Sequence, residues 1–311
     1  MSTGFVNRLS MTKTSDVHFN IAAVERDIGV SKDVLRVWER RYGFPSPERD
    51  AHGERLYPLD QVERLRLVKR LMDQGHRPGK LLAAPMAALA KMSSASPPPV
   101  FGDGTAGAED VEALLALIKE HDAAGYAHAL QQRLARQGLL RFVQNTVEPL
   151  TLLIGSAWEQ GRIRVFEEHL FTELTRRALR QAIEVVSGGR APRILLTSPP
   201  EEQHGLGLLM VEAVLTLEEA HCIPLGTQMP LLEIAGAARA HQVDIVALSF
   251  SAAFPARQVP ALLLQLRALL ERPVALWAGG AGVRRSAPLD GVRFVASLSD
   301  AVTALEEWRG A

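Results

Sequence analysis

The chain has 311 residues, enough for two or three domains that each bury a hydrophobic core. Its 35 lysines and arginines balance its 35 aspartates and glutamates, so the overall charge excludes a strongly basic or strongly acidic protein. The single cysteine, Cys222, excludes a disulfide within the chain, and no apolar run reaches the roughly 20 residues of a membrane span. We therefore expect a cytoplasmic protein without a signal peptide and without membrane contact.

Residues 18–82 are expected to form a small helical head with a mild basic bias. Residues 1–85 hold 15 lysines and arginines against 11 aspartates and glutamates. A short helix after Asn20 is followed by a glycine turn, and Ser31 is a suitable N-cap for a second helix over 32–42. The buried side of this second helix is predicted to carry Val34, Leu35 and Trp38. Two helices joined by a tight turn are a recurrent way to place one helix in the major groove of DNA.

Three strings in the head resemble the DNA-binding domain of the MerR-type regulators: LRVWERRYG at 35–43, GERLY at 53–57 and DQVERL at 60–65. The resemblance covers residues 19–81 and implies a winged helix-turn-helix that binds operator DNA. The DNA-binding residues that it implies are Arg36 on the recognition helix, Arg41 and Tyr42 at backbone phosphates, Arg55 on the wing, and Arg40 as a further contact. The long dimerisation helix usual in these regulators does not follow Leu82, so self-association, from dimer to tetramer, is expected of the C-terminal half.

A linker over 83–108 is predicted to separate the head from the rest of the chain. It includes the string MSSASPPPVFGDGTAG at 92–107, whose consecutive prolines favour an extended, semi-stiff chain. Residues 109–188 then show helical periodicity without strand signals, with apolar stripes such as Leu170, Leu174 and Ile183. This pattern predicts about four helices packed as a bundle.

From residue 192 to 311, short β-like runs alternate with helical stretches. The runs lie at 194–197, 222–225, 243–249, 274–277 and 292–295. Five such alternations predict a Rossmann-like α/β domain with a five-stranded parallel sheet, called the sheet domain below. Ligands of open parallel sheets bind at the carboxyl edge of the strands.

The loop after the first run holds Glu202, His204 and Gly207, which places an imidazole at that edge. A neutral imidazole is a suitable cobalt ligand, and a carboxylate two residues away can accept its other ring N–H and orient it. The spacing resembles the Asp-x-His-x-x-Gly motif of cobalamin-binding domains, with glutamate in place of aspartate. The resemblance implies a cobalt corrinoid cofactor with His204 as its lower axial ligand.

Two further strand ends follow that family in the same order. Ser249 and Ser251 end the third run, where the family places serine for contacts with the nucleotide tail of the corrinoid. Gly279 and Gly280 end the fourth run, where paired glycines make room for the tail. Cys222 is expected to be a buried strand residue, and covalent attachment of a different tetrapyrrole there is the alternative.

In the bundle, nine residues separate Trp158 from the Glu168-His169 pair. The pattern resembles the helical cap of the CarH/LitR group of cobalamin-dependent photoreceptor repressors, and implies that the tryptophan packs on the adenosyl ligand with the pair nearby. The alternative places Trp158 in the bundle core and the pair on a solvated face. Some members carry histidine directly after the tryptophan, whereas this chain has Glu159, which disfavours a bis-histidine light product unless His169 takes that role.

The resemblance implies a light-responsive repressor, not an enzyme, that binds adenosylcobalamin and operator DNA in the dark and releases the DNA after photolysis. Glu202 and Glu159 keep a second interpretation open, in which the same architecture senses haem or biliverdin, or acts without cobalamin. A cobalamin enzyme subunit is disfavoured, because no segment can form a substrate barrel of about 250 residues and such an enzyme has no use for the head.

Overall fold

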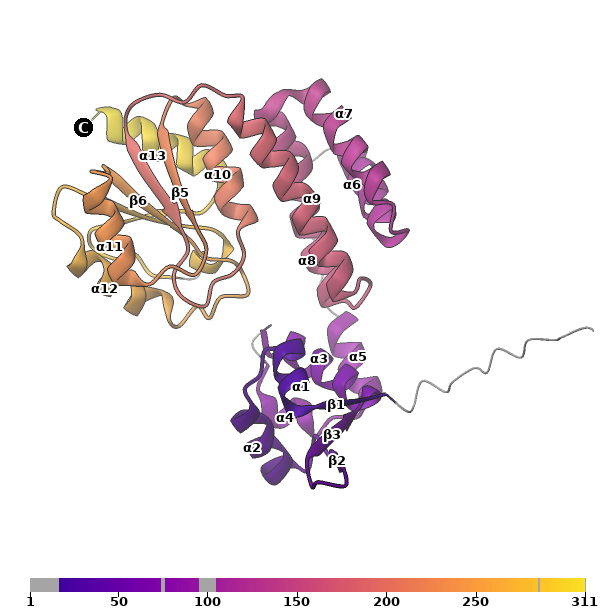
Figure 1. Ribbon diagram of the computed structural model, residues 1–311. Coiled ribbons are helices and arrows are strands. Elements are labelled where there is room, and N and C mark those ends of the chain that lie inside the picture. The colour runs from indigo at the N-terminus through magenta and orange to yellow at the C-terminus, as the bar shows by residue number, and fades with distance from the viewer. Residues whose placement is uncertain (1–16, 74–75, 95–104, 285, 311) are drawn as a thin grey trace, which may run out of the picture. The chain divides into compact units, whose positions relative to one another are not determined.

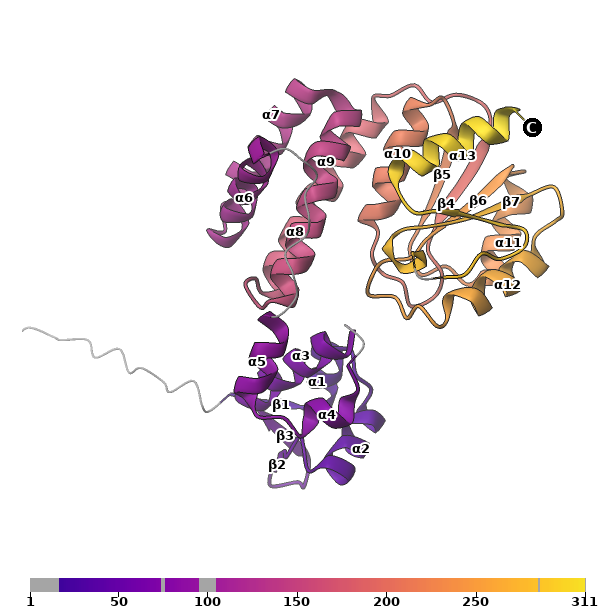
Figure 2. The ribbon, with the colours of Figure 1, turned by 180° about the vertical axis from the view of Figure 1, so that it is seen from behind.

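The computed structural model describes residues 17–73, 76–94, 105–284 and 286–310. The chain divides into two compact units, residues 1–96 and 97–311, which are described separately (Figures 1 and 2). Most of the proline-rich string predicted as linker lies outside the described residues.

The smaller unit contains the head, a helical domain with a small antiparallel sheet in the strand order β1-β3-β2. Its elements are β1 (His18–Asn20), α1 (Ile21–Ile28), α2 (Lys32–Tyr42), β2 (Glu48–Arg49), β3 (Arg55–Pro58), α3 (Leu59–Asp73), α4 (Pro78–Leu82) and α5 (Met86–Ser94). Residues 86–94, predicted as linker, form α5 instead, because their alanine-rich sequence favours a helix and Leu89 packs fully buried into the head core.

The core of the head explains the orientation of α2. Leu35 and Trp38 are 0% and 4% exposed, as the sequence predicts. The prediction that Val34 shares their buried side is wrong, because its side chain is 40% exposed. Leu35 and Trp38 form the centre of the apolar stripe, and Val34 lies at its edge, where the helix surface turns toward solvent.

The larger unit begins with the predicted bundle of helices (Figure 1). Its elements are α6 (Thr105–Lys119), α7 (Ala123–Phe142), the π-helical turn η2 (Val143–Val147), α8 (Glu148–Glu159) and α9 (Val165–Glu184). The positive φ of Gly138 (71°) kinks α7 near its C-terminal end. The buried apolar side chains of all four helices form one core.

The sheet domain follows, with the predicted five parallel strands in the order β5-β4-β6-β7-β8. The strands are β4 (Arg193–Thr197), β5 (His221–Gly226), β6 (Ile245–Ser249), β7 (Ala275–Gly279) and β8 (Val292–Val295). The helices are α10 (Leu206–Leu217), α11 (Leu231–Ala240), α12 (Val259–Leu269), η3 (Ala281–Val283) and α13 (Leu298–Gly310). Helices α10 and α13 cover one face, and α11 and α12 the other (Figure 2).

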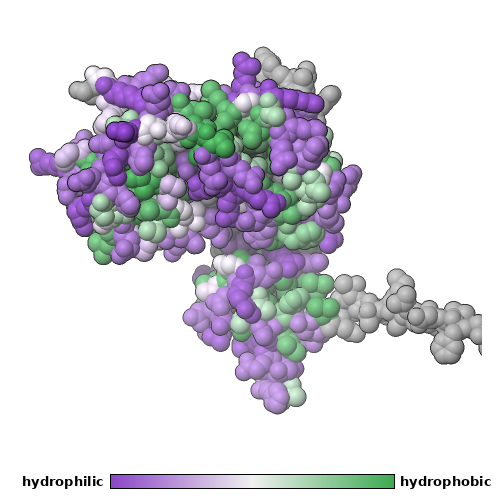
Figure 3. Space-filling model, turned by 45° about the horizontal axis from the view of Figure 1, so that its top comes forward, coloured by the Kyte–Doolittle hydropathy of each residue, from purple (hydrophilic) through white to green (hydrophobic). Residues whose placement is uncertain are grey.

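The strand order reverses between β4 and β6, so the crevice for a ligand is expected beyond the carboxyl ends of these strands. Apolar residues of α10 also belong to the core of the bundle. The contact between α9 and α10 therefore joins the bundle to the sheet domain. In the part of the chain that the structure describes, no helix is both long and apolar enough to cross a membrane. Figure 3 shows apolar areas between the polar side chains on the surface of the larger unit.

Candidate functional site

The loop that connects β4 to α10 carries the predicted metal ligand. Ser198, fully buried at the end of β4, donates its hydroxyl hydrogen to the carbonyl of Glu202 (2.6 Å) and accepts the N–H of Gln228 (3.0 Å). The N–H of Met229 donates to the carbonyl of Ser198 (3.0 Å). These bonds fasten the loop to the segment between β5 and α11. This role of Ser198 was not predicted, although its place directly after an apolar strand is a signal for such a role.

Glu202 and His204 form the imidazole–carboxylate pair that the spacing predicts. The Nδ1 atom of His204 lies 2.7 Å from Oε1 of Glu202, so the longer arm of glutamate reaches the ring. The Glu202 side chain is 1% exposed, whereas that of His204 is 51% exposed. A buried carboxylate thus holds a partly exposed imidazole by one nitrogen, and Nε2 is the nitrogen that would bind a metal.

The same carboxylate also organises the backbone around it. It accepts the N–H of His204 at Oε1 (2.9 Å) and the N–H of Ser251 at Oε2 (2.8 Å). Burial acts to raise the pKa of Glu202, but the hydrogen bonds from the His204 ring and from the two backbone N–H groups outweigh it and lower the pKa. The carboxylate is therefore ionised, as an acceptor for three donors must be.

The two predicted serines occupy different positions in this cluster. The hydroxyl of Ser251 lies 3.1 Å from Nδ1 of His204, so Ser251 contacts both members of the pair. Ser249 ends β6 next to the start of α10. A Cβ placed on Gly207 would lie 3.2 Å from Oγ of Ser249, so glycine allows the first turn of α10 to pass close to this strand end.

The predicted glycines are explained by packing within the protein. Gly280 has φ +92°, and a Cβ there would lie 2.4 Å from the carbonyl oxygen of Phe250. A Cβ on Gly279 would lie 3.0 Å from the carbonyl oxygen of Val295. Gly282, which the sequence analysis did not single out, approaches the carbonyl of Ser251 in the same way, with a Cβ 2.5 Å away. Gly280 and Gly282 let the loop that bears Ser251 lie against the end of β7, and Gly279 lets β8 approach it. The room that Gly279 and Gly280 leave for a nucleotide tail stays a prediction.

Trp158 lies near the end of α8, and Glu168 and His169 lie near the start of α9. Trp158 is partly buried against the bundle core, near the C-terminal end of α8. The Glu168 carboxylate lies 3.3 Å from Nδ1 of His169 and accepts the hydroxyl of Thr172 (2.8 Å). The side chain of His169 is 72% exposed. Glu159 is the last residue of α8, and burial raises the pKa of its carboxyl group.

A second histidine, His121, contacts the start of α9. Nε2 of His121 lies 3.1 Å from Oε1 of the buried Glu167, and its ring is 5.3 Å from that of Phe166. Glu167 also accepts the N–H of Arg164 (2.6 Å), which caps the start of α9. The glutamate in the third position of the helix was a signal for the cap, whereas nothing in the sequence pointed to His121.

Cys222 lies on β5 and is partly buried. Burial raises the pKa of its thiol to about 12. The thiolate that covalent attachment requires is therefore disfavoured at neutral pH.

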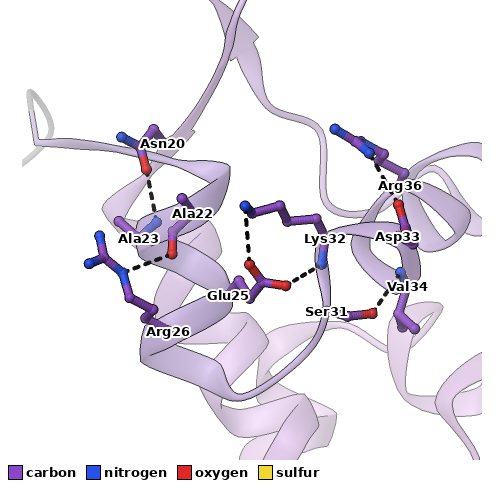
Figure 4. A network of polar contacts seen from close by, with 10 residues as sticks. All are labelled: Asn20, Ala22, Ala23, Glu25, Arg26, Ser31, Lys32, Asp33, Val34 and Arg36. Atoms are coloured by element: carbon purple, nitrogen blue, oxygen red, sulfur yellow. Dashed lines mark hydrogen bonds and ion pairs between the residues drawn. The ribbon is translucent and has the colours of Figure 1, made fainter.

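The head presents its helix-turn-helix as predicted (Figure 4). Gly29 ends α1 with φ +65°, and the hydroxyl of Ser31 accepts the N–H of Val34 (3.4 Å) at the start of α2. Glu25 fixes the turn between the helices, because its carboxylate accepts the N–H of Lys32 (3.0 Å) and pairs with the ammonium group of the same lysine (3.4 Å).

Basic side chains lie on the exposed surface of α2. Arg36, Arg40 and Arg41 are exposed, and Arg36 pairs with Asp33 at 3.1 Å. The Arg41 guanidinium lies over the ring of Tyr42, 5.4 Å from its centre. The contacts of these groups with phosphates or bases stay a prediction.

Arg55, the predicted wing residue, lies on β3 and is bound to α2. Its Nε donates to Glu39 at 2.8 Å, its second contact to that carboxylate is 3.4 Å long, and both side chains are only about a quarter exposed. The hydrogen bond to Glu39 raises the pKa of Arg55. The role of Glu39 was not predicted from the sequence.

Comparisons with known proteins identify the family of the chain. Residues 19–81 match the family described as MerR HTH family regulatory protein, and residues 111–183 match the family described as B12 binding domain. The chain is 31% identical over 261 residues to the HTH-type transcriptional repressor CarH of Myxococcus xanthus, which covers 82% of this chain and 86% of CarH. This chain belongs to the CarH/CarA family of transcriptional regulators.

The second repressor of this family in the comparison, CarA of Myxococcus xanthus, is 28% identical over 268 residues, or 85% of this chain and 87% of CarA. Among solved structures, the monomethylamine corrinoid protein of Methanosarcina barkeri superposes with a TM-score of 0.53 at 18% identity, over 65% of this chain and all of that protein. This superposition shows a shared fold. The chain is thus a CarH/CarA-type DNA-binding regulator with a MerR-type head and a B12-binding domain.

Proposed function

We propose that this CarH/CarA-family member is a light-responsive repressor. It binds operator DNA as an adenosylcobalamin-dependent oligomer in the dark and releases the DNA after photolysis. The observation that carries the proposal is the position of the His204 imidazole at the carboxyl edge of the sheet. Its Nδ1 lies 2.7 Å from the buried carboxylate of Glu202.

The donor set fits a cobalt corrinoid. Cobalt accepts a neutral imidazole, and the Glu202 carboxylate, as acceptor of the Nδ1 hydrogen, selects the tautomer with its lone pair on Nε2. At the same edge, Gly207 lies in the first turn of α10, Gly279 ends β7 and Gly280 follows it, so three glycines lie where the resemblance expects small residues. His204 would bind the metal, and Ser249 and Ser251 would contact the nucleotide tail.

The bundle would supply the light-sensitive side. Adenosylcobalamin supplies a cobalt–carbon bond that green or blue light breaks. Trp158 would pack on the adenosyl group, with Glu168 and His169 beside it, and would lose this packing partner when the group departs. The turn between α8 and α9 would then adopt a second arrangement, which makes the bundle a two-state element.

Self-association, from dimer to tetramer, is assigned to the larger unit. The head ends in the short helices α4 and α5. Large apolar side chains of the larger unit that are 50–70% exposed include Leu152, Phe166, Leu232 and Leu264. Joining several heads raises the affinity for operator DNA through effective concentration, without new base contacts. The proposal assigns regulation to the chain, not catalysis.

The test is a DNA mobility-shift assay with an operator fragment recovered by selection. We expect a shift with adenosylcobalamin in darkness, little shift without it, and loss of the shift after green light. His204→Ala should abolish the cobalamin dependence, whereas His221→Ala, at the opposite end of the strands, should not. A shift that depends on neither cobalamin nor light would overturn the proposal.

A further inference from the structure

The ion pair between Arg55 and Glu39 joins the two DNA-facing elements of the head. Glu39 lies on α2, the helix that the MerR-type fold inserts into DNA, and Arg55 lies on β3 of the wing. Sixteen residues separate them in sequence, yet Nε of Arg55 and Oε2 of Glu39 are 2.8 Å apart. Both side chains are about three quarters buried, so water screens the pair less than it screens a surface ion pair.

Hydrogen bonds within the wing order it independently of this ion pair. The carboxylate of Asp50 accepts the N–H groups of His52 and Glu54, both at 2.8 Å, and Arg49 donates to the carbonyl of Gly53 at 2.7 Å. The hairpin is therefore a preformed unit. Its orientation on the body of the head must come from contacts at its base.

Beside the pairing of β3 with β1 and the hydrogen bonds between Gln61 and Ser46, two side chains of β3 contribute to those contacts. Residues two apart in a strand share one face, so Arg55 and Tyr57 both point to the body of the head. Tyr57 is fully buried in the head core, and Arg55 binds Glu39. Tyr57 fixes the depth of the strand by packing, and the ion pair fixes the angle of the wing relative to α2.

Glu39 places a negative charge on the helix that approaches DNA. A carboxylate on a helix that approaches DNA repels the phosphates unless a cation compensates it. Arg55 supplies that compensation, and its own positive charge is then paired with Glu39 within the protein. Arg55 consequently contributes less to phosphate binding than the exposed Arg40 and Arg41 of α2.

We propose that Glu39 is a positioning residue for DNA binding. Through its pair with Arg55 it holds the wing at the angle to α2 that the DNA backbone requires, and Arg55 acts through this pair and not as a phosphate contact. The inference rests on the DNA binding of the MerR-type head and is independent of cobalamin and light.

The test uses the full-length chain without corrinoid, in darkness, at protein concentrations of about 1–100 μM, where non-specific binding by a single head is measurable without the cobalamin-dependent oligomer. The DNA is a mixed-sequence linear duplex, and the titration is repeated across a series of salt concentrations. Glu39→Gln should weaken binding by about 3- to 10-fold, the size expected for a partly buried, charge-assisted pair. Glu54→Gln removes an equal charge from the exposed wing and should bind as tightly as the wild type or tighter. Thermal unfolding followed by circular dichroism shows whether each variant keeps the fold of the head.

The salt dependence separates positioning from phosphate contact. Arg41→Ala should lower the slope of log affinity against log salt by about 0.9, the value for one lost phosphate contact. Arg55→Gln should weaken binding with an unchanged slope, and Arg55→Lys, which keeps the charge but loses the two-pronged geometry, should not restore it. The double variant Glu39→Gln/Arg55→Gln should bind no more weakly than Arg55→Gln alone.

Two results would overturn the inference. Tighter binding by Glu39→Gln, equal to that of Glu54→Gln, would mean that Glu39 only repels DNA. A slope reduced by Arg55→Gln as much as by Arg41→Ala would make Arg55 a phosphate contact. Absence of duplex binding by the wild-type chain would instead contradict DNA binding by the head. The inference about Glu39 would then fail with it, because it rests on that binding.

Discussion

Replacing Glu202 by glutamine tests how the candidate site holds His204. Oε1 of Glu202 accepts the His204 N–H at 2.9 Å and lies 2.7 Å from Nδ1, while Oε2 accepts the Ser251 N–H at 2.8 Å. Glutamine has the same shape but only one acceptor oxygen. In either orientation its NH2 group faces a backbone N–H, so at least one hydrogen bond is replaced by a contact between two donors.

The size of the effect follows from these contacts. A lost hydrogen bond to a charged, buried group costs about 1.5–3 kcal/mol. Loss of the partner that orients a metal-bound histidine lowers metal affinity by about 10- to 100-fold, or about 1.4–2.7 kcal/mol. The two estimates agree, so Glu202→Gln should weaken adenosylcobalamin binding by about 10- to 100-fold.

The assay is an equilibrium titration of the apo-protein with adenosylcobalamin in darkness, followed by visible absorption. The matched control is Glu201→Gln, which removes the same charge from the exposed neighbouring residue and should leave the affinity unchanged. Glu202→Asp keeps the charge with a shorter arm, so it should fall between wild type and Glu202→Gln. Wild-type affinity in Glu202→Gln, or equal losses in both glutamine variants, would refute a role for this carboxylate in orienting His204.

Three further changes test other parts of the structure. Gly280→Ala should destabilise the larger unit by about 1–3 kcal/mol in denaturant unfolding, because its φ is +92° and the new Cβ would lie 2.4 Å from a carbonyl oxygen; unchanged stability would contradict this geometry. Arg180→Ala removes the partner of the buried Glu212 (2.8 Å) and should cost about 2 kcal/mol at neutral pH. Burial already raises the pKa of Glu212, so the loss should shrink at acid pH, where the carboxyl is protonated. The pKa of Glu202 is lowered, so its contribution to the free energy of unfolding is complete above the ordinary carboxyl value of 4.5 and is lost as the pH falls through the lowered pKa. The wild type should therefore lose this part of its thermal stability in acid, and Glu202→Gln should not.

The elements with strong local signals could be predicted from the sequence. Each of the five strands is a short apolar run between helical stretches, and each predicted run overlaps its observed strand within a few residues. Ser31 caps α2 because its side chain can reach the N–H of Val34, a contact within one turn. The Glu202–His204 pair was predictable for the same reason, since its partners are two residues apart in one loop.

Side-chain pairs between distant segments could not be predicted. Arg55 and Glu39, His121 and Glu167, and Arg180 and Glu212 are 16, 46 and 32 residues apart. Their contacts depend on how the elements pack, which no local pattern encodes. For Arg55 the consequence is functional, because a residue that resembles a DNA contact in sequence is bound within the head.

Glycines near the candidate site show a second limit. Gly279 and Gly280 indicated small residues at a strand end, and in the structure a Cβ at either position would lie 3.0 Å or less from a backbone carbonyl oxygen. Their neighbours are the carbonyls of Phe250 and Val295, so the close approach is between protein segments. From sequence alone, room for a ligand and room for another backbone look the same.

The most direct test of the central claim is a visible absorption spectrum of the apo-protein mixed with adenosylcobalamin in darkness, desalted, and scanned before and after green light. We predict that the corrinoid elutes with the protein, that its spectrum changes irreversibly on illumination, and that His204→Ala alters both retention and the dark spectrum. Elution of the corrinoid with the small molecules, or a retained spectrum that light leaves unchanged, would contradict a cobalamin-based light sensor.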